Sequence, residues 1–139
     1  MLKCKLDLEQ SKTVYDKCKQ HIQVKQCYNN VFGVVMEYIS TFRSGKWKVA
    51  YGYAEVMAGV YCRHCFILDE SGKVIDPTIY AQREQRNRSY YVMTVFDDVD
   101  VYMAAVEDAD FMPSLDKYLR ERDRVAQQWA YENSIVFIG

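Results

Sequence analysis

The sequence predicts one α+β domain in which helices pack against an antiparallel sheet, and three observations carry this prediction. Apolar residues recur at helical spacing up to residue 44 and again after Pro113. Between them, residues 46–96 contain runs rich in Val, Tyr and Ile that are separated by glycine-containing breaks. Segregated helices and strands of this kind are typical of α+β folds. A length of 139 residues fits a single domain, 1–139, because it leaves no room for two independent cores.

Three helices are expected from the spacing of apolar side chains. The first spans about Leu8 to His21. The second begins at Cys27 and carries an apolar stripe as far as the stop signal Ser44-Gly45. The third starts near Pro113-Ser114. The stripe of the second helix includes Cys27, so this cysteine opens a helix on the side that faces the core.

Strands are expected where β-branched and aromatic residues alternate with breaks: Lys46 to Gly59, Val60 to Leu68, Lys73 to Ile79, Tyr90 to Phe96, and a short closing strand at Ile135 to Ile138. A polar loop, Gln82 to Arg88, precedes the fourth strand. The segment Asp69-Glu70-Ser71-Gly72 predicts a hairpin with a three-residue loop. That register makes Phe66 face Asp76 and places His64 one diagonal step from Asp76 on the same sheet face. A slip of one residue would put the last two on opposite faces.

Composition and charge exclude several classes of protein. Half of the residues are hydrophobic and 14% are aromatic, which excludes intrinsic disorder. The formal net charge of −1 provides no strong field for nucleic acid or an anionic membrane, so neither is expected as a partner. No apolar run matches a secretory signal or a membrane span. Five cysteines at irregular spacing suit free thiols in a reducing compartment, which predicts a cytoplasmic protein.

Cys27, His64 and Asp76 supply the three groups that thiol catalysis requires. A thiol attacks a carbonyl as its thiolate, and the free N–H groups and dipole of a helix N-terminus favour that anion at Cys27. The same N–H groups can stabilise an oxyanion. His64 is the candidate base, and Asp76 is placed to hold its imidazole in the required tautomer. No cofactor is expected.

The order of these residues resembles transglutaminase-like and papain-like thiol enzymes, particularly small bacterial and phage-associated members. The resemblance covers roughly Gln20 to Tyr80. It depends on four segments in order: Gln26-Cys27-Tyr28-Asn29-Asn30 at a helix start, Tyr51-Gly52-Tyr53 on a strand, His64 on the next strand, and Val74-Ile75-Asp76-Pro77-Thr78 on the one after. The resemblance implies that Cys27 is the nucleophile, His64 the general base and later the acid, and Asp76 the orienting carboxylate.

Three further site residues are weaker candidates. Papain-like enzymes use a glutamine upstream of the nucleophile as an oxyanion donor, and the resemblance makes Gln23 or Gln20 the best candidate. Tyr53 is one of four tyrosines that the predicted strands bring together, and it is a candidate to line a substrate cleft, although half-buried tyrosines are common on sheets. The sequence departs from the family in having Cys65 directly after His64.

Each of these residues also has a structural explanation. Free cysteines are usually buried as small hydrophobes, a lone histidine can be satisfied in a core, and Asp76 could cap the turn at Pro77. Cys62-Arg63-His64-Cys65 resembles a zinc ligand pair, but a strand points its two cysteines to opposite faces and no second pair appears, so no metal is expected. His21 is the only alternative base. The joint pattern of Cys27, His64 and Asp76 is harder to explain structurally.

The pattern therefore predicts a thiol hydrolase or acyl transferase that acts on an amide, of a peptide or a glutamine side chain, through a covalent acyl-enzyme. Peptidases, deamidases and transglutaminases share the first half of that reaction. The alternative is a non-catalytic binding or effector module that captures another protein through a Tyr-rich surface. Either function implies a protein or peptide partner. The acidic stretch Asp97 to Asp110 is a further candidate partner site by its charge alone.

Overall fold

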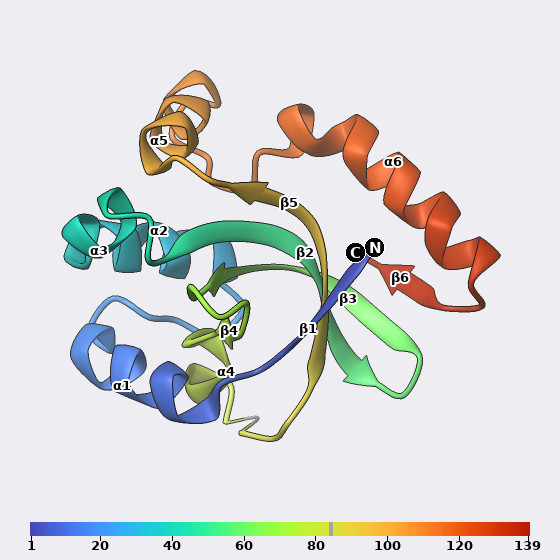
Figure 1. Cartoon of the computed structure of the whole chain (residues 1–139), viewed down its shortest axis with the longest axis horizontal. Helices are drawn as coiled ribbons and strands as arrows, with labels where there is room; N and C mark the ends of the chain where they lie inside the picture. Colours follow the sequence, from blue (N-terminus) through green and yellow to red (C-terminus); the bar gives the residue numbers. More distant parts are fainter. Residues whose placement is uncertain (84) are drawn as a thin grey trace.

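The structure is a computed structural model that describes residues 1–83 and 85–139. A strongly bent, six-stranded sheet lies at its centre (Figure 1). The strand order is β1-β5-β2-β3-β4, and β6 pairs with β3. The β3–β6 pair is parallel and the other pairs are antiparallel, so the sheet is mixed rather than wholly antiparallel. The strands are β1 (Leu2–Lys5), β2 (Lys48–Met57), β3 (Val60–Leu68), β4 (Val74–Ile75), β5 (Ser89–Phe96) and β6 (Val136–Ile138).

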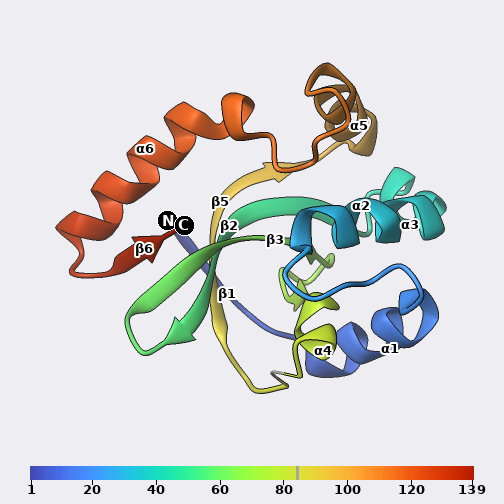
Figure 2. The ribbon, with the colours of Figure 1, turned by 180° about the vertical axis from the view of Figure 1, so that it is seen from behind.

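The helices cover the two ends of the sheet. Figures 1 and 2 both show α1 to α4 gathered at one end, with α6 and β6 at the other. The helices are α1 (Leu8–Cys18), α2 (Cys27–Glu37), α3 (Ile39–Arg43), α4 (Thr78–Ala81), α5 (Val99–Asp108) and α6 (Asp116–Glu132). The main core lies where α1, α2 and α5 pack on β2 and β3, and a separate aromatic cluster lies under α6. The α+β class predicted from the sequence is confirmed.

The helix predicted to start at Cys27 does start there, but it is shorter than expected. Tyr38, at φ −113° and ψ 31°, leaves the helical conformation and divides the expected helix into α2 and α3. The helix predicted near Pro113 is α6, which begins at Asp116. Neither α5 nor β1 was expected.

The predicted hairpin between β3 and β4 has the predicted register. Leu68 pairs with Val74, and Gly72 takes a positive φ of 83° in the three-residue loop. Continuing this register places Asp76 one diagonal step from His64 on the same face. Because the loop and its closing pairs are adjacent in the sequence, local turn chemistry is sufficient to fix the pairing.

The third predicted strand ends earlier than expected, at Ile75 rather than Ile79. Pro77 has no N–H to donate to a sheet, and Thr78 begins the short helix α4. Asp76 therefore lies at the junction of a strand and a helix. It is fully buried there.

The outer edge of β3 is covered in two pieces. β6 pairs with residues 60–62, and β4 pairs with residues 67–68. Between them, residues 63–66 pair with no strand of the described chain on that side, and α2 packs against β3. The fold thus leaves an interval in the edge of β3 that contains His64.

Two expectations concern the rest of the chain. The predicted polar loop from Gln82 to Arg88 contains Glu84, which lies outside the described residues, while residues 82–83 and 85–88 form neither helix nor strand. Within residues 1–83 and 85–139, none of the helices has the length and apolar character that crossing a bilayer requires.

Candidate active site

Cys27, His64 and Asp76 come together at the open interval of β3. His64 Nε2 lies 2.8 Å from Asp76 Oδ2. Cys27 is the first residue of α2, is 7% exposed, and lies close enough to the His64 ring to raise the pKa of the imidazole. Because Asp76 occupies Nε2, Nδ1 is the ring nitrogen that remains for the sulfur. The structure shows the approach of His64 to Asp76 that the hairpin register predicts. The catalytic role of Cys27, His64 and Asp76 stays a prediction.

The pKa of His64 is raised well above its ordinary value of 6.5. Burial, the largest single effect, lowers this pKa, but the charge and hydrogen bond of Asp76 together with the smaller effects of the Cys27 sulfur outweigh it. These surroundings therefore favour the cationic imidazole. A cationic imidazole beside a thiol favours the thiolate, which is the nucleophilic form.

Asp76 is held by groups from two other elements. The Tyr90 hydroxyl donates a hydrogen bond of 2.7 Å to Asp76 Oδ2, the same oxygen that binds His64. The Asp76 N–H donates to Ser11 Oγ at 2.9 Å, and the Ser11 hydroxyl donates to the Asp7 carbonyl oxygen at 2.6 Å. Helix α1 and strand β5 therefore fix the position of the carboxylate that orients the imidazole.

Tyr90 is a positioning residue that the sequence did not identify. It lies on β5, which is separated from β3 by β2, and it reaches Asp76 across Gly52 and Ala54, two β2 residues with little or no side chain. The rings of Tyr90 and His64 have their centroids 6.3 Å apart. Only the strand order brings Tyr90 to the site, and no local pattern in the sequence reveals that order.

Replacing Tyr90 by phenylalanine is expected to lower the free energy of unfolding by about 2 kcal/mol, since it removes a buried hydrogen bond to a charged group. Chemical denaturation measures this change. Tyr61→Phe is the matched control, because Tyr61 loses a bond of 2.8 Å to Ser89, a neutral hydroxyl, and lies in the cluster under α6. A smaller loss in Tyr90→Phe than in Tyr61→Phe would contradict the assignment of Tyr90 to the site.

The start of α2 is the positive end of a helix, and it has neither an acidic first turn nor a side-chain cap. The first-turn N–H groups have no partner inside the helix. The N-cap residue Gln26 makes no side-chain cap hydrogen bond, and the first turn contains no acidic residue. The helix dipole therefore acts on the Cys27 sulfur, and the free N–H groups are placed where an oxyanion on a bound carbonyl would form.

Asn30, one turn into α2, joins the start of this helix to the segment that follows Asp76. Its side chain accepts a hydrogen bond from the Gln23 N–H at 2.9 Å and donates to the Gln23 carbonyl at 2.8 Å. It also donates to Thr78 Oγ1 at 3.0 Å. A buried amide that bridges both segments limits how far Cys27 and Asp76 can move apart.

The weaker candidates lie in different places. Gln20 and Gln23 are exposed in the segment that leads to α2, and an oxyanion role for either stays a prediction. Tyr53 is fully buried, stacks on Phe137 with ring centroids 3.9 Å apart, and donates to Asp123. In the β2–β3 ladder Tyr53 pairs with Arg63, so it lies on the face opposite His64. Tyr53 is a core residue beneath α6 and does not line a cleft.

The remaining cysteines and the second histidine lie outside this arrangement. All five cysteines are free thiols. Cys65 is fully buried, Cys62 is partly exposed, and the described residues contain no cluster of three or more His, Cys, Asp or Glu that could hold a metal ion. His21 is exposed in the turn after α1.

Comparison of the chain with protein-family models, with curated proteins and with solved structures finds no match. The coordinates define an α+β protein with a mixed, mostly antiparallel sheet and a Cys-His-Asp arrangement at its open edge. A function for this arrangement therefore has to be argued from its geometry.

Proposed function

We propose that the protein is a thiol hydrolase or acyl transferase, papain-like or transglutaminase-like, that acts on an amide carbonyl of a protein or peptide. The observation that carries the proposal is the arrangement of Cys27, His64 and Asp76, in which a cysteine at a helix start lies beside an imidazole that is hydrogen-bonded to a buried carboxylate. A buried histidine needs a hydrogen-bond partner in any role, but a purely structural one does not require a thiol at a helix start beside the same ring.

In the first half of the proposed reaction, the Cys27 thiolate attacks the carbonyl carbon and forms a carbon–sulfur bond. The N–H groups at the start of α2 donate to the oxyanion. His64 gives its proton to the amide nitrogen as the carbon–nitrogen bond breaks, which leaves a thioester and a free amine or ammonia. Asp76 keeps Nδ1 of the ring directed at the sulfur throughout.

In the second half, the neutral imidazole of His64 takes a proton from water or from an acceptor amine, which attacks the thioester. Cys27 leaves as the thiolate, and the imidazolium is restored. Water gives hydrolysis or deamidation, and an amine gives acyl transfer. Atoms and charge balance with that one co-reactant.

The non-catalytic alternative loses its main support. It required a surface rich in tyrosine, but of the 12 tyrosines, all within the described residues, only Tyr118 and Tyr131 are exposed. The others are buried or half-buried, mostly in aromatic clusters.

Iodoacetamide labelling at pH 7, followed at each cysteine by mass spectrometry, tests the proposal. We expect Cys27 to react at least about 10-fold faster than the other four cysteines, because a helix start beside a histidine ring is the environment typical of reactive cysteines. In contrast, burial raises the pKa of Cys4, Cys18 and Cys65. His64→Ala should slow the labelling of Cys27 by about 10-fold or more.

His21→Ala is the matched control, because it removes the exposed histidine and should leave the rate at Cys27 unchanged. Equal, slow labelling of all five cysteines would contradict the proposal. So would a rate at Cys27 that is the same with and without the His64 ring.

A further inference from the structure

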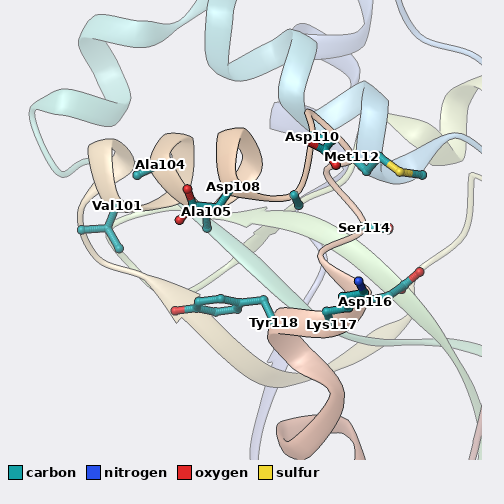
Figure 3. A pocket seen from close by; sticks show the side chains of 11 residues that line it. Val101, Ala104, Ala105, Asp108, Asp110, Met112, Ser114, Asp116, Lys117 and Tyr118 are labelled. Atoms are coloured by element: carbon teal, nitrogen blue, oxygen red, sulfur yellow. The ribbon is translucent and has the colours of Figure 1, made fainter.

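An apolar groove with an acidic rim lies between α5 and the start of α6 (Figure 3). Its volume is about 520 Å³, which is within the usual range for ligand sites. Its walls include three exposed apolar side chains, Val101, Met112 and Tyr118, and its rim carries three carboxylates, Asp108, Asp110 and Asp116. Lys117 supplies one positive charge at the same rim.

The charge around this groove is strongly one-sided. Residues 97–116 contain seven of the 19 acidic residues of the chain and none of its 18 basic residues. Basic residues elsewhere pair with three of the seven: Lys48 with Asp97 at 3.0 Å, Arg43 with Asp100 at 3.8 Å, and Arg63 with Asp116 at 3.4 Å. Asp108 and Asp110 form no ion pair within the described part of the chain. The groove therefore carries unneutralised negative charge beside exposed apolar surface.

One end of the groove lies near residues that neighbour Cys27 and His64 in the sequence. The Tyr51 hydroxyl donates a hydrogen bond of 2.5 Å to the Pro113 carbonyl, and the Tyr51 ring stacks on Tyr28, the residue after Cys27, with centroids 6.0 Å apart. Asp116 pairs with Arg63, which directly precedes His64. Pro113, which precedes α6, and Asp116, its first residue, are therefore each linked by a side chain to a residue next to Cys27 or His64: Pro113 to Tyr28 through Tyr51, and Asp116 to Arg63 directly.

We propose that this groove binds a segment of the protein substrate in which an arginine or lysine lies beside an apolar residue, and that it presents the neighbouring amide to Cys27. The inference rests on the proposed function. Val101, Met112 and Tyr118 would cover the apolar side chain, and the free carboxylates of Asp108 and Asp110 would bind the cationic one. An acidic segment would be repelled, so the groove selects by charge as well as by shape.

Fluorescence anisotropy with the full-length Cys27→Ala protein, in which no turnover can occur, tests the inference. The probe is a fluorescein-labelled, end-capped peptide with the core Leu-Arg-Leu-Gln, and its partner peptide has Glu in place of Arg. We expect the Arg peptide to bind at least about 10-fold more tightly than the Glu peptide. The double variant Asp108→Asn/Asp110→Asn should weaken binding of the Arg peptide by about 10-fold.

A second double variant, Glu70→Gln/Glu107→Gln, is the matched control, because it removes the same charge from exposed positions that do not line the groove. An equal loss in both double variants, equal binding of the two peptides, or no binding of the Arg peptide at millimolar concentration would each overturn the inference. Labelling of Cys27 is an independent readout. If Cys27 is reactive but binding does not depend on charge, the proposed function stands and the groove inference is wrong. If binding depends on charge but Cys27 is unreactive, the groove is a peptide site and the proposed enzyme function is wrong.

Discussion

Replacing Asp76 by asparagine is expected to lower the free energy of unfolding by about 3 kcal/mol at pH 6.5, since breaking a buried ion pair leaves the remaining charge uncompensated. Asparagine keeps the shape of the side chain but removes the charge that His64 and Tyr90 bind. Asp76 is fully buried and the His64 side chain is only 14% exposed, so water replaces little of the lost interaction. Urea unfolding of the two proteins measures the difference.

The same substitution should change how stability depends on pH. The pKa of His64 in the folded protein is above its ordinary value of 6.5, so the folded state holds this proton more tightly than the unfolded chain does. The resulting stabilisation is complete below about pH 6.5 and is lost as the pH rises through the folded pKa. Without the Asp76 charge, the burial that lowers the pKa of His64 is opposed only by the smaller effect of Cys27. The loss of His64-linked stability with rising pH should therefore be absent in Asp76→Asn.

The informative range is pH 6.5 to about 8.5, because cysteines of the unfolded chain begin to titrate above it. Cys27→Ala is the background for this test, because it removes the sulfur that also ionises in the proposed mechanism. In that background stability should fall across this range, while that of Cys27→Ala/Asp76→Asn should stay nearly level. Adding His21→Ala should leave the slope of Cys27→Ala unchanged, since His21 is exposed and outside the site. Parallel slopes with and without the Asp76 charge would mean that the carboxylate does not control the charge of His64.

The parts of the site that could be predicted from the sequence are those set by local structure. The helix start at Cys27 follows from apolar spacing within one helix. The approach of His64 to Asp76 follows from one hairpin, in which Gly72 and a three-residue loop fix the register. Both depend on residues that are close in the chain, where turn chemistry and side-chain periodicity are reliable guides.

The parts that could not be predicted depend on long-range pairing. Tyr90 binds Asp76 because β5 lies beside β2, and that strand order is set by the packing of the whole sheet. The parallel pairing of β6 with β3 has the same origin. The sequence also left open which face of β2 is covered by α6, and so Tyr53 was expected at a cleft when it lies in the core.

Unlike the positions of Tyr90 and β6, helix α5 does have a local signal in the sequence. Asp98 accepts a hydrogen bond from the Asp100 N–H as an N-cap, and Val99, Tyr102 and Val106 lie buried at spacings of three and four residues. The acidic character of this stretch hid the pattern. Its charge is concentrated on exposed positions, which is also why α5 can supply one wall of an acidic groove.

Gly52→Ala is expected to cost at least about 3 kcal/mol of folding free energy, because the added methyl group has no space. A Cβ at this position would lie 1.9 Å from the Tyr91 carbonyl oxygen and 3.0 Å from its carbonyl carbon. Both atoms belong to the backbone of β5, so relief requires moving the strand. Gly52 lies at the irregularity in the β2–β5 ladder, where the register of the two strands shifts.

Gly33→Ala is the matched control for Gly52→Ala. Gly33 lies inside α2, and a Cβ there would meet only the His21 Cβ at 3.9 Å, an ordinary contact. Alanine should stabilise this helix by about 0.5–1 kcal/mol, because glycine costs more backbone entropy. Thermal unfolding of the two variants should therefore shift in opposite directions, and a tolerated Gly52→Ala would show that β5 has room to move.

Gly52 also affects the geometry of the proposed active site. It pairs with His64 in the β2–β3 ladder, and its missing side chain lets Tyr90 reach across β2 to Asp76. A displacement of β5 would move the Tyr90 hydroxyl away from the carboxylate. Any folded fraction of Gly52→Ala should therefore label more slowly at Cys27 than the wild type, whereas Gly33→Ala should label at the wild-type rate. We attribute such a loss to the displaced sheet, which positions Asp76 through Tyr90.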